Sequence, residues 1–362
     1  MKKISVLCLC AGLLSFSACK DIDTSTLKEN QGTFILNSGS DNSTISYYNF
    51  ENESCQNDYF QKNNGGQSIG KNVRSMAIRR GTAYPDGKGY VVVDGHIEVI
   101  DMKTFKSIKQ IDGISNPGDI ILVSETRGYV TSGNGTGDDS DVIIELDLVN
   151  DTKGDSYKVG NAPVKMVTSG KYLYVANKGT EAVADNRIMV IDLSQGTVSV
   201  DTVEVAAAPI DLGVDKFGHV WAYCNGTGTN NDQALVKLEK VFNADNGRLE
   251  HNTVSLPFSE RKSQGNHCLT MSKFGGELFY VHGETYRMNV SEKEPVARKC
   301  ITGDYAGTTF SSIDVDPRTG RFNALTGDAS GKMVEYTIKA NVLDFKAEYP
   351  VGVNPISTAY FY

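Results

Sequence analysis

The chain has 362 residues, of which 40% are hydrophobic and 22% charged, an ordinary composition for a globular protein. Its formal net charge is −8, and no basic run is longer than a pair. These features argue against a surface that binds nucleic acid or anionic membranes, so we expect no nucleic-acid partner. The 36 glycines against 9 prolines are typical of a chain with many tight turns.

The N-terminus carries the features of a targeting segment rather than of a fold. Two lysines precede an apolar run over residues 4–14, which is too short to span a bilayer as a mature helix. The sequence Phe16-Ser17-Ala18-Cys19 resembles a bacterial lipobox, in which the cysteine is acylated. Phe16 departs from the usual aliphatic residue, which leaves a plain secretory signal as the alternative. We expect residues 1–18 to be a lipoprotein signal peptide and Cys19 to be the lipidation site.

A polar stretch without periodicity follows, and we interpret residues 19–31 as a lipidated tether. About a dozen flexible residues span roughly 20 Å, enough for a globular domain to stand off a membrane and contact a neighbour. The start of this stretch, Lys20-Asp21-Ile22-Asp23, resembles the acidic signal that sends lipoproteins of Bacteroidetes-type bacteria to the outer face of the outer membrane. We therefore expect an anchored, surface-exposed protein, with the periplasmic side as the alternative.

Seven segments in the rest of the chain share one design, in which an apolar strand ends in a polar residue and a glycine, and a second strand ends in a hydrophobic-polar-hydrophobic step. The polar residue of the second marker recurs after 52, 46, 45, 47, 50 and 48 residues. A period of this length built from short strands is typical of a β-propeller. We predict an all-β, seven-bladed propeller over residues 32–362, with four antiparallel strands per blade. The second markers are Asn49, Asp101, Asp147, Asp192, Glu239, Asn289 and Thr337.

The two ends of this region predict how the ring closes. Residues 33–37 match the second strand of a repeat, whereas residues 356–362 match a first strand with nothing after it. The C-terminal strand should therefore be the innermost strand of the N-terminal blade, which protects edges that open sheets expose. Residues 239–250 are expected to make one turn of helix in a longer hairpin. Prolines suit the first position of a strand, where no N–H is needed, and they open four repeats: Pro117, Pro163, Pro209 and Pro355.

In a propeller, the loops between second and third strands and the corners before each first strand gather at one mouth of the channel. Here long polar loops at 132–141, 177–186 and 224–233 stand beside short ones, which favours a pocket on a lopsided rim. Asparagine offers donors and an acceptor without charge, so a ring of asparagines suits a large polar ligand rich in amides. Turn chemistry is the alternative for each asparagine. The predicted ligand-binding residues are Asn72, Arg74, Asn116, Asn161, Asn177, Asn225, His267, His282 and Asn354.

Arg74 is the most distinctive of these residues, because a cation at a channel mouth can hold a phosphate or carboxylate. The alternative is an ordinary ion pair with a neighbouring blade. The only tryptophan, Trp221, alternates with Tyr223 on a strand and is expected to pack between blades.

Metal and cofactor sites are weakly indicated. Asp138, Asp139 and Asp141 could ligate Ca²⁺ through oxygen, but a solvated loop is preferred. His267-Cys268 with His282 could hold a transition metal only if the side chains converge. The glycines of 133–137 and 226–228 precede no helix, so a nucleotide site is not expected. Besides Cys19, four cysteines lie outside the signal, at positions 55, 224, 268 and 300, and they fit no CxxC pattern; a 224–268 disulfide and buried free thiols both remain open. We predict no metal and no cofactor.

Motifs of known catalytic sites such as His-Glu-x-x-His and a Walker lysine are missing. We therefore expect a protein that is not an enzyme. A propeller lactonase or hydrolase is the less favoured alternative, since such enzymes need carboxylates and asparagine converging on a divalent metal in the channel.

The proline corners, the strand ends Val99-Ile100-Asp101-Met102 and Val190-Ile191-Asp192-Leu193, and the strand Tyr174-Val175-Ala176-Asn177 resemble the YncE-like seven-bladed propellers among surface lipoproteins of gut Bacteroidetes. The resemblance covers about residues 32–362. Within that class the chain is similar to the BtuG-type lipoproteins, which capture cobamides such as vitamin B12 and pass them to a TonB-dependent outer-membrane transporter.

This resemblance implies a capture protein for a small-molecule nutrient, with a cobamide favoured, partnered with a TonB-dependent transporter and held to the membrane by its lipid alone. It carries over no binding residues. A protein-interaction or adhesion scaffold without a small ligand is the alternative.

Overall fold

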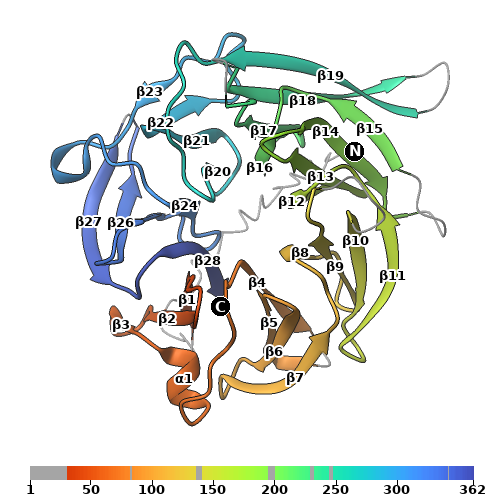
Figure 1. Cartoon of the computed structure of the whole chain (residues 1–362). Helices are drawn as coiled ribbons and strands as arrows, with labels where there is room; N and C mark the ends of the chain where they lie inside the picture. The colour runs from red at the N-terminus through yellow and green to blue at the C-terminus, as the bar shows by residue number, and fades with distance from the viewer. Residues whose placement is uncertain are drawn as a thin grey trace, which may run out of the picture.

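The structure is a computed structural model that describes residues 31–81, 84–135, 141–194, 200–228, 232–243, 248–340 and 342–362. These described residues form seven four-stranded antiparallel sheets, arranged as the blades of a ring (Figure 1). This confirms the predicted seven-bladed β-propeller. The predicted signal peptide, Cys19 and the tether up to residue 30 lie outside the described residues.

The blades follow one another around the ring in chain order, and the strands of each blade are named from the channel outwards. Blade 1 has β28 (Pro355–Phe361), β1 (Gly32–Asn37), β2 (Thr44–Asn49) and β3 (Ser54–Gln56), and blade 2 has β4 (Ser75–Gly81), β5 (Tyr84–Val93), β6 (His96–Asp101) and β7 (Lys106–Asp112). Blade 3 has β8 (Pro117–Leu122), β9 (Arg127–Ser132), β10 (Val142–Asp147) and β11 (Thr152–Lys158), and blade 4 has β12 (Pro163–Ser169), β13 (Tyr172–Gly179), β14 (Ala184–Asp192) and β15 (Val200–Glu204).

The remaining three blades keep the same order of strands. Blade 5 has β16 (Pro209–Val214), β17 (Val220–Cys224), β18 (Ala234–Asn243) and β19 (Arg248–Pro257). Blade 6 has β20 (Leu269–Met271), β21 (Glu277–His282), β22 (Glu284–Asn289) and β23 (Arg298–Lys299), and blade 7 has β24 (Ser312–Val315), β25 (Phe322–Leu325), β26 (Lys332–Ile338) and β27 (Leu343–Pro350).

The two ends of the chain close the ring, as predicted. In blade 1 the C-terminal strand β28 pairs antiparallel with β1, and Gly32 lies opposite Phe361 while Ile35 lies opposite Thr358. β1 in turn pairs with β2 along its whole length. Blade 1 is therefore assembled from strands more than 300 residues apart, which ties the first blade to the last element of the chain and leaves no open seam.

Apolar side chains on the faces of the blades pack between neighbouring blades. Trp221 of β17 is 1% exposed and belongs to a cluster with Leu278 and Phe279 of blade 6. Between blades 1 and 2, the Phe34 ring stacks on Phe105 with centroids 4.8 Å apart. The predicted inter-blade role of Trp221 is confirmed, and its indole N–H is satisfied by Asp215 Oδ2 at 3.0 Å.

Helix is confined, among the described residues, to α1 (Tyr59–Asn63) and a 3-10 turn, η2 (Gly303–Tyr305). A helical turn was expected within 239–250, but residues 239–243 continue β18 and residues 248–250 begin β19, while residues 244–247 lie outside the described residues. Their paired backbones satisfy each other across a long hairpin, so no helical hydrogen bonds are needed there. No helix in the described part of the chain is long and apolar enough to cross a bilayer.

All four cysteines of the described residues are free thiols, with Cys55 half-buried and Cys224, Cys268 and Cys300 buried. Burial raises the pKa of Cys55 to about 11 and that of Cys300 to about 12. At neutral pH these thiols are therefore protonated, and they act as small apolar side chains in the core.

Candidate functional site

The corners that precede the innermost strands share an unusual backbone conformation. Asn72, Asn116 and Asn354 have φ of 47°, 43° and 52°, and Ala162 and Ala208 have φ of 49° and 52°. Asparagine enters this left-handed region more readily than most other residues. Turn chemistry therefore explains why three of the predicted binding asparagines occur where they do, whatever their side chains bind.

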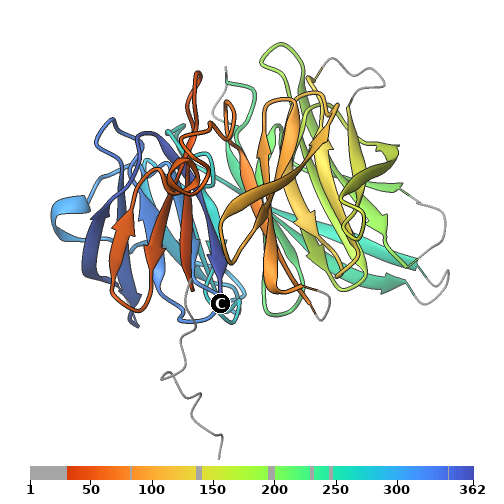
Figure 2. The same ribbon diagram turned by 90° about the horizontal axis from the view of Figure 1, so that it is seen from below.

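These left-handed corners are fastened to the loops between second and third strands of the same blade. The Ser38 N–H donates to the Asn354 carbonyl at 3.0 Å, and the Asn225 N–H donates to the Ala208 carbonyl at 2.8 Å. The Lys178 N–H makes the same contact with Ala162, at 3.1 Å. Corners and loops therefore gather at one mouth of the channel, as the sequence predicts for a propeller. The C-terminus lies at the opposite end of the ring (Figure 2).

A cavity of about 920 Å³ opens at this mouth. Its volume is near the upper end of the range of small-molecule sites, about 300–1,000 Å³. Side chains from six blades and from the segment 258–266 line it. Five of the nine predicted residues are among the lining residues: Asn72, Arg74, Asn225, His267 and Asn354.

The other four predicted residues lie elsewhere. Asn116 lines a separate hollow of about 510 Å³ together with Asp94. The Asn161 backbone N–H donates to Asp185 Oδ2 at 2.7 Å. Asn177 is fully buried, because β13 continues to Gly179 and the alternation of the strand turns its amide into the blade, where Nδ2 donates to the Val175 and Arg187 carbonyls.

His282 is the fourth, and it is held within the structure rather than facing the cavity. Its Nδ1 lies 2.9 Å from the Tyr223 hydroxyl, its Nε2 lies 2.9 Å from the Glu260 carbonyl, and its ring stacks on Phe258 with centroids 4.0 Å apart. Burial lowers the pKa of His282, so the imidazole is neutral at physiological pH. Its contacts fix the segment that runs from β19 to β20.

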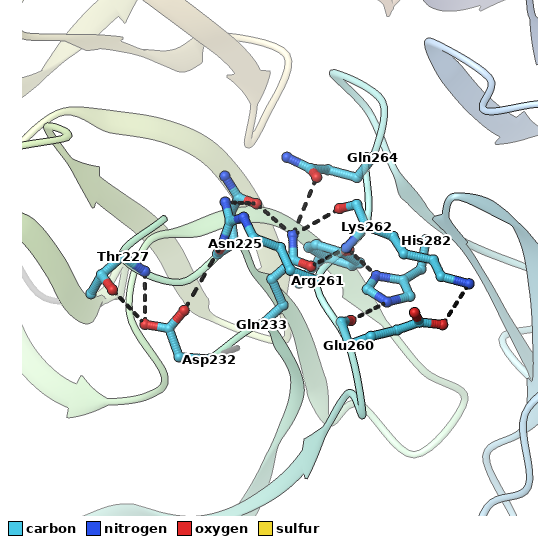
Figure 3. A network of polar contacts seen from close by, with 10 residues as sticks. Asn225, Thr227, Asp232, Gln233, Glu260, Arg261, Lys262, Gln264 and His282 are labelled. Carbon is cyan, nitrogen blue, oxygen red and sulfur yellow. Dashed lines mark hydrogen bonds and ion pairs between the residues drawn. The ribbon is translucent and has the colours of Figure 1, made fainter. Parts of the chain in front are cut away.

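That segment, residues 258–266, forms one side of the mouth, and a polar network holds it in place (Figure 3). The Gln233 amide is the centre of the network: Oε1 accepts from the Lys262 N–H at 2.8 Å, while Nε2 donates to the Lys262 carbonyl at 3.0 Å and to Asn225 Oδ1 at 2.8 Å. Arg261 Nη1 donates to the Asn225 carbonyl at 2.7 Å. The network places Gln264 and Asn266 on the cavity.

Gln264 and Asn266 were missed by the sequence reasoning, because segment 258–266 has no counterpart in the other repeats. Asn266 is exposed, and no hydrogen bond of its side chain occurs among the described residues. We use the name rim amides for the neutral side chains that line the mouth: Asn72, Asn225, Gln264, Asn266 and Asn354. All of them except Asn266 also make a side-chain hydrogen bond within the described part of the protein.

Arg74 at the mouth forms an ion pair. The sequence left open an ion pair with a neighbouring blade, but the partner of Arg74 lies in its own blade. Its Nη2 lies 3.1 Å from Asp94 Oδ1, and Asn72 Nδ2 donates to Asp94 Oδ2 at 2.6 Å. Both ionic side chains remain more than 40% exposed, so the pair can exchange partners with a ligand at small cost.

Deeper in the channel, titratable side chains project from the innermost strands. They fall three residues after the corner in several blades, as in Pro117-Gly118-Asp119, Pro163-Val164-Lys165 and Pro209-Ile210-Asp211. We call Asp119, Lys165, Asp211, His267 and Asp314 the inner cluster. This proline-x-charge pattern is a signal that the sequence reasoning could have used and did not.

The carboxylates of the inner cluster join neighbouring blades. Asp119 Oδ1 accepts from Ser75 Oγ of blade 2 at 2.8 Å, and its Oδ2 accepts from the Met166 N–H of blade 4 at 2.9 Å. Asp314 accepts from Thr270 Oγ1 of blade 6 at 3.2 Å and from Thr358 Oγ1 of blade 1 at 2.9 Å. Each of these two side chains therefore links the blades on both of its sides.

Asp211 makes the densest set of contacts. Its Oδ2 accepts from the N–H groups of Cys268 and Leu269, at 2.7 and 2.9 Å, and lies 2.8 Å from His267 Nδ1. Burial alone would raise the pKa of Asp211, but His267, Lys165 and the backbone donors outweigh it, and the pKa is lowered. Burial alone would likewise lower the pKa of His267, yet the Asp211 carboxylate raises it. The pair is therefore ionised over a wide range of pH.

The donors that a metal would need are otherwise engaged. No group of three or more His, Cys, Asp or Glu side chains among the described residues is arranged to hold a metal ion. Asp141, one of the three aspartates weighed for Ca²⁺, is buried and accepts from the Gly135 N–H at 2.9 Å; Asp138 and Asp139 lie outside the described residues. Cys268 is buried in the core, and His282 is held by the Tyr223 hydroxyl and the Glu260 carbonyl. The side chains of His267, Cys268 and His282 therefore do not converge on a transition-metal site.

Comparison with solved structures shows the same ring in proteins of low sequence identity. A quinoprotein alcohol dehydrogenase-like protein from Bacteroides thetaiotaomicron is 15% identical, with a TM-score of 0.60 over 91% of this chain and 78% of that one. The periplasmic gluconolactonase of Pseudomonas aeruginosa is 12% identical, with a TM-score of 0.62 over 92% and 99%. A functionally unknown protein from Desulfotomaculum acetoxidans is 11% identical, with a TM-score of 0.61 over 92% and 99%. At such identities the likeness shows the fold alone.

No curated protein matches the chain. One family model, described as a domain of unknown function (DUF5074), matches residues 31–361. This range contains every strand of the ring. The chain therefore belongs to the DUF5074 family.

Proposed function

We propose that this protein is a lipid-anchored capture protein of the outer membrane, which binds a small-molecule nutrient at the channel mouth and hands it to a TonB-dependent transporter. The observation that carries the proposal is the cavity of about 920 Å³, with its rim amides and few free charges. Such a lining supplies many neutral hydrogen bonds and suits a polar ligand that itself carries amides.

A cobamide is the favoured ligand, because its corrin ring bears a set of amide side chains that can exchange donors and acceptors with the rim amides. Its size exceeds the cavity, so it would lie across the mouth with one end inserted. Arg74 would then be the group that meets the phosphate of the ligand, since its pair with Asp94 is exposed. The similarity of the sequence to BtuG-type lipoproteins supports the same choice.

The lipid anchor expected near the N-terminus also supports the proposal. Acylation of Cys19 would hold the domain at the surface, and the tether would let it reach a transporter in the same membrane. Mass spectrometry of the membrane-extracted protein tests this part, because an acylated Cys19 at the N-terminus is expected.

Calorimetry with cyanocobalamin, haem and a neutral oligosaccharide tests the capture function. Trp221 is only 1% exposed, so its fluorescence is a poor reporter of binding at the mouth. We expect cyanocobalamin to bind and Asn266→Trp to weaken binding about tenfold or more, or roughly 1.4 kcal/mol, by filling the mouth. Asn252→Trp on the exposed edge strand β19 is the matched control and should leave affinity unchanged. Absence of heat with all three ligands would contradict the proposal and favour a scaffold that binds only proteins.

Hydrolysis of a lactone is a second candidate, favoured by the Asp211–His267 pair at the cavity. Above its raised pKa the His267 imidazole is neutral, and an imidazole that a carboxylate orients can then act as a general base. The likeness to a gluconolactonase supports it only at the level of the fold. Turnover of gluconolactone that is lost in His267→Gln would establish this activity.

A further inference from the structure

The end of the ring opposite the cavity carries a second set of turns with a shared design. In the turn 215–219, Asp215 Oδ1 accepts from the N–H groups of Phe217 and His219, at 2.9 and 3.0 Å. In the turn 316–320, Asp316 Oδ1 accepts from the Arg318 N–H at 2.8 Å in the same way. Both carboxylates are buried, so the negative charge of each turn faces inwards, whereas Lys216 is exposed and Arg318 is half-buried.

Direct contacts join these turns into one surface. The Lys216 N–H donates to the Gly275 carbonyl of the next blade at 3.0 Å, and Lys273 Nζ donates to the Arg318 carbonyl in the blade after that. Arg318 Nη1 in turn donates to Gln31 Oε1 at 2.7 Å. We call the turns 215–219, 272–276 and 316–320 the tether face, because Gln31 is the residue at which the chain from Cys19 enters the ring. The C-terminus marks this end in Figure 2.

The tether face combines basic side chains with exposed aromatic rings. Phe217 and Phe274 are 57% and 80% exposed, and the ammonium groups of Lys216 and Lys273 lie 5.0 and 5.5 Å from the centres of these rings. Neither lysine forms an ion pair with a carboxylate of the described residues. These two phenylalanines lie on turns that touch each other and leave most of their surface outside the core, and aromatic rings beside lysines are typical of surfaces that meet lipid headgroups.

We propose that the tether face rests on a bilayer with anionic, phosphate-bearing headgroups. Lys216, Lys273 and Arg318 would meet the phosphates, while Phe217 and Phe274 would enter at the level of the headgroups. The net charge of −8 disfavours such binding for the molecule as a whole, and the tether face is a local exception because its turn carboxylates point inwards.

The choice of a bilayer rather than another partner comes from where the chain enters the ring. The anchor that we propose at Cys19 is joined to Gln31 by a dozen residues, so this face is the part of the domain that lies closest to the attachment point, and the inference rests on that anchoring. The cavity then faces the medium while a solute is captured, and the domain must turn on its tether to deliver that solute to the transporter. The sequence predicted contact with the membrane through the lipid alone; the tether face adds a second contact.

Sedimentation with vesicles tests the proposal on unlipidated chain from residue 20 to residue 362, which contains every strand of the ring. Vesicles of phosphatidylcholine are compared with vesicles that contain 30% phosphatidylglycerol. We expect binding to the anionic vesicles only, and its loss in high salt. Lys216→Ser with Lys273→Ser should lower the partition coefficient by about fivefold for each charge removed. Phe217→Ser with Phe274→Ser should lower it as well.

The matched control is Lys62→Ser with Lys71→Ser, which removes the same charge from exposed positions outside the tether face and should change binding less than twofold. Equal losses in both double variants, equal binding to both kinds of vesicle, or no binding at all would overturn the proposal, and the last outcome would point to a protein partner. Calorimetry with cyanocobalamin on the same variants separates this inference from the proposed function. Intact ligand binding with no vesicle binding defeats the tether face alone, and vesicle binding without ligand defeats capture alone.

Discussion

The inner cluster and the rim amides lie only a few residues apart along the same strands and corners, yet they differ in how their polar groups are satisfied. Asp211 in the inner cluster is fully buried, and one of its oxygens accepts from two backbone N–H groups of the next blade beside the His267 ring. Asn266 at the rim is exposed, without a side-chain partner among the described residues. The blades are thus held together from inside the channel, whereas at the mouth the Asn266 amide is available to a ligand and the other rim amides keep a hydrogen bond within the protein.

The largest expected effect that tests this difference between the inner cluster and the rim amides is on the free energy of unfolding. Asp211→Ala leaves the Cys268 and Leu269 N–H groups without that acceptor and His267 without its buried counter-charge, so we expect a loss of about 3–5 kcal/mol in the free energy of unfolding. Asp211→Asn keeps the shape and one acceptor, and a loss of about 1–3 kcal/mol is expected. Urea denaturation measures both.

The matched change at the mouth is Arg74→Ala, which breaks the exposed pair with Asp94. Exposed pairs contribute about 0–1 kcal/mol, so this variant should unfold almost as the unmodified protein does. If Arg74→Ala and Asp211→Ala cost the same, the mouth and the inner cluster would not differ in the way that their hydrogen bonds indicate.

A smaller effect concerns pH. The pKa of His267 is raised above 6.5 in the folded protein, so its contribution to stability is fully present below pH 6.5 and is lost as pH rises through the raised pKa. His267→Gln should remove that decline in the free energy of unfolding. Urea titrations between pH 6 and 9 provide the measurement, and an unchanged slope would contradict the assigned pair.

His282 should have the opposite effect on the pH dependence of stability, because burial lowers its pKa whereas the pKa of His267 is raised. The neutral ring is favoured in the fold, so stability is lost as pH falls below 6.5 towards the lowered pKa. His282→Gln should therefore flatten the acidic side of the profile and leave the side above pH 6.5 intact, the opposite of His267→Gln.

Much of the fold could be predicted from the sequence, because a propeller repeats the same alternation of strands and turns in every blade. The closing pair of β1 and β28 followed from two fragments, 33–37 and 356–362, that complete each other. In the segment 239–250, where a helical turn was expected, residues 239–243 and 248–250 are strand for a local reason. Polar residues at the end of a long hairpin look like the start of a helix, whereas pairing between β18 and β19 satisfies the same backbone groups.

Residues of the candidate site could be predicted only where the course of the backbone alone determines that a residue lies at the mouth. Corners and loop ends had to lie at the mouth, which is why Asn72, Asn225 and Asn354 were found. Asn177 failed to reach the cavity because its strand continues for two more residues, and strand length is poorly encoded in a single sequence. Gln264 and Asn266 were missed because their segment depends on the Gln233 network, a long-range arrangement without a local pattern.

Hydrogen exchange with and without saturating cyanocobalamin tests most directly whether the ligand is captured at the mouth. At a ligand concentration 100 times the Kd, we expect exchange in residues 258–266 and around Asn72 to slow by up to about 100-fold, while the turns 215–219 and 272–276 on the tether face keep their rates. Protection on the tether face with none at the mouth, or no protection anywhere, would contradict the account.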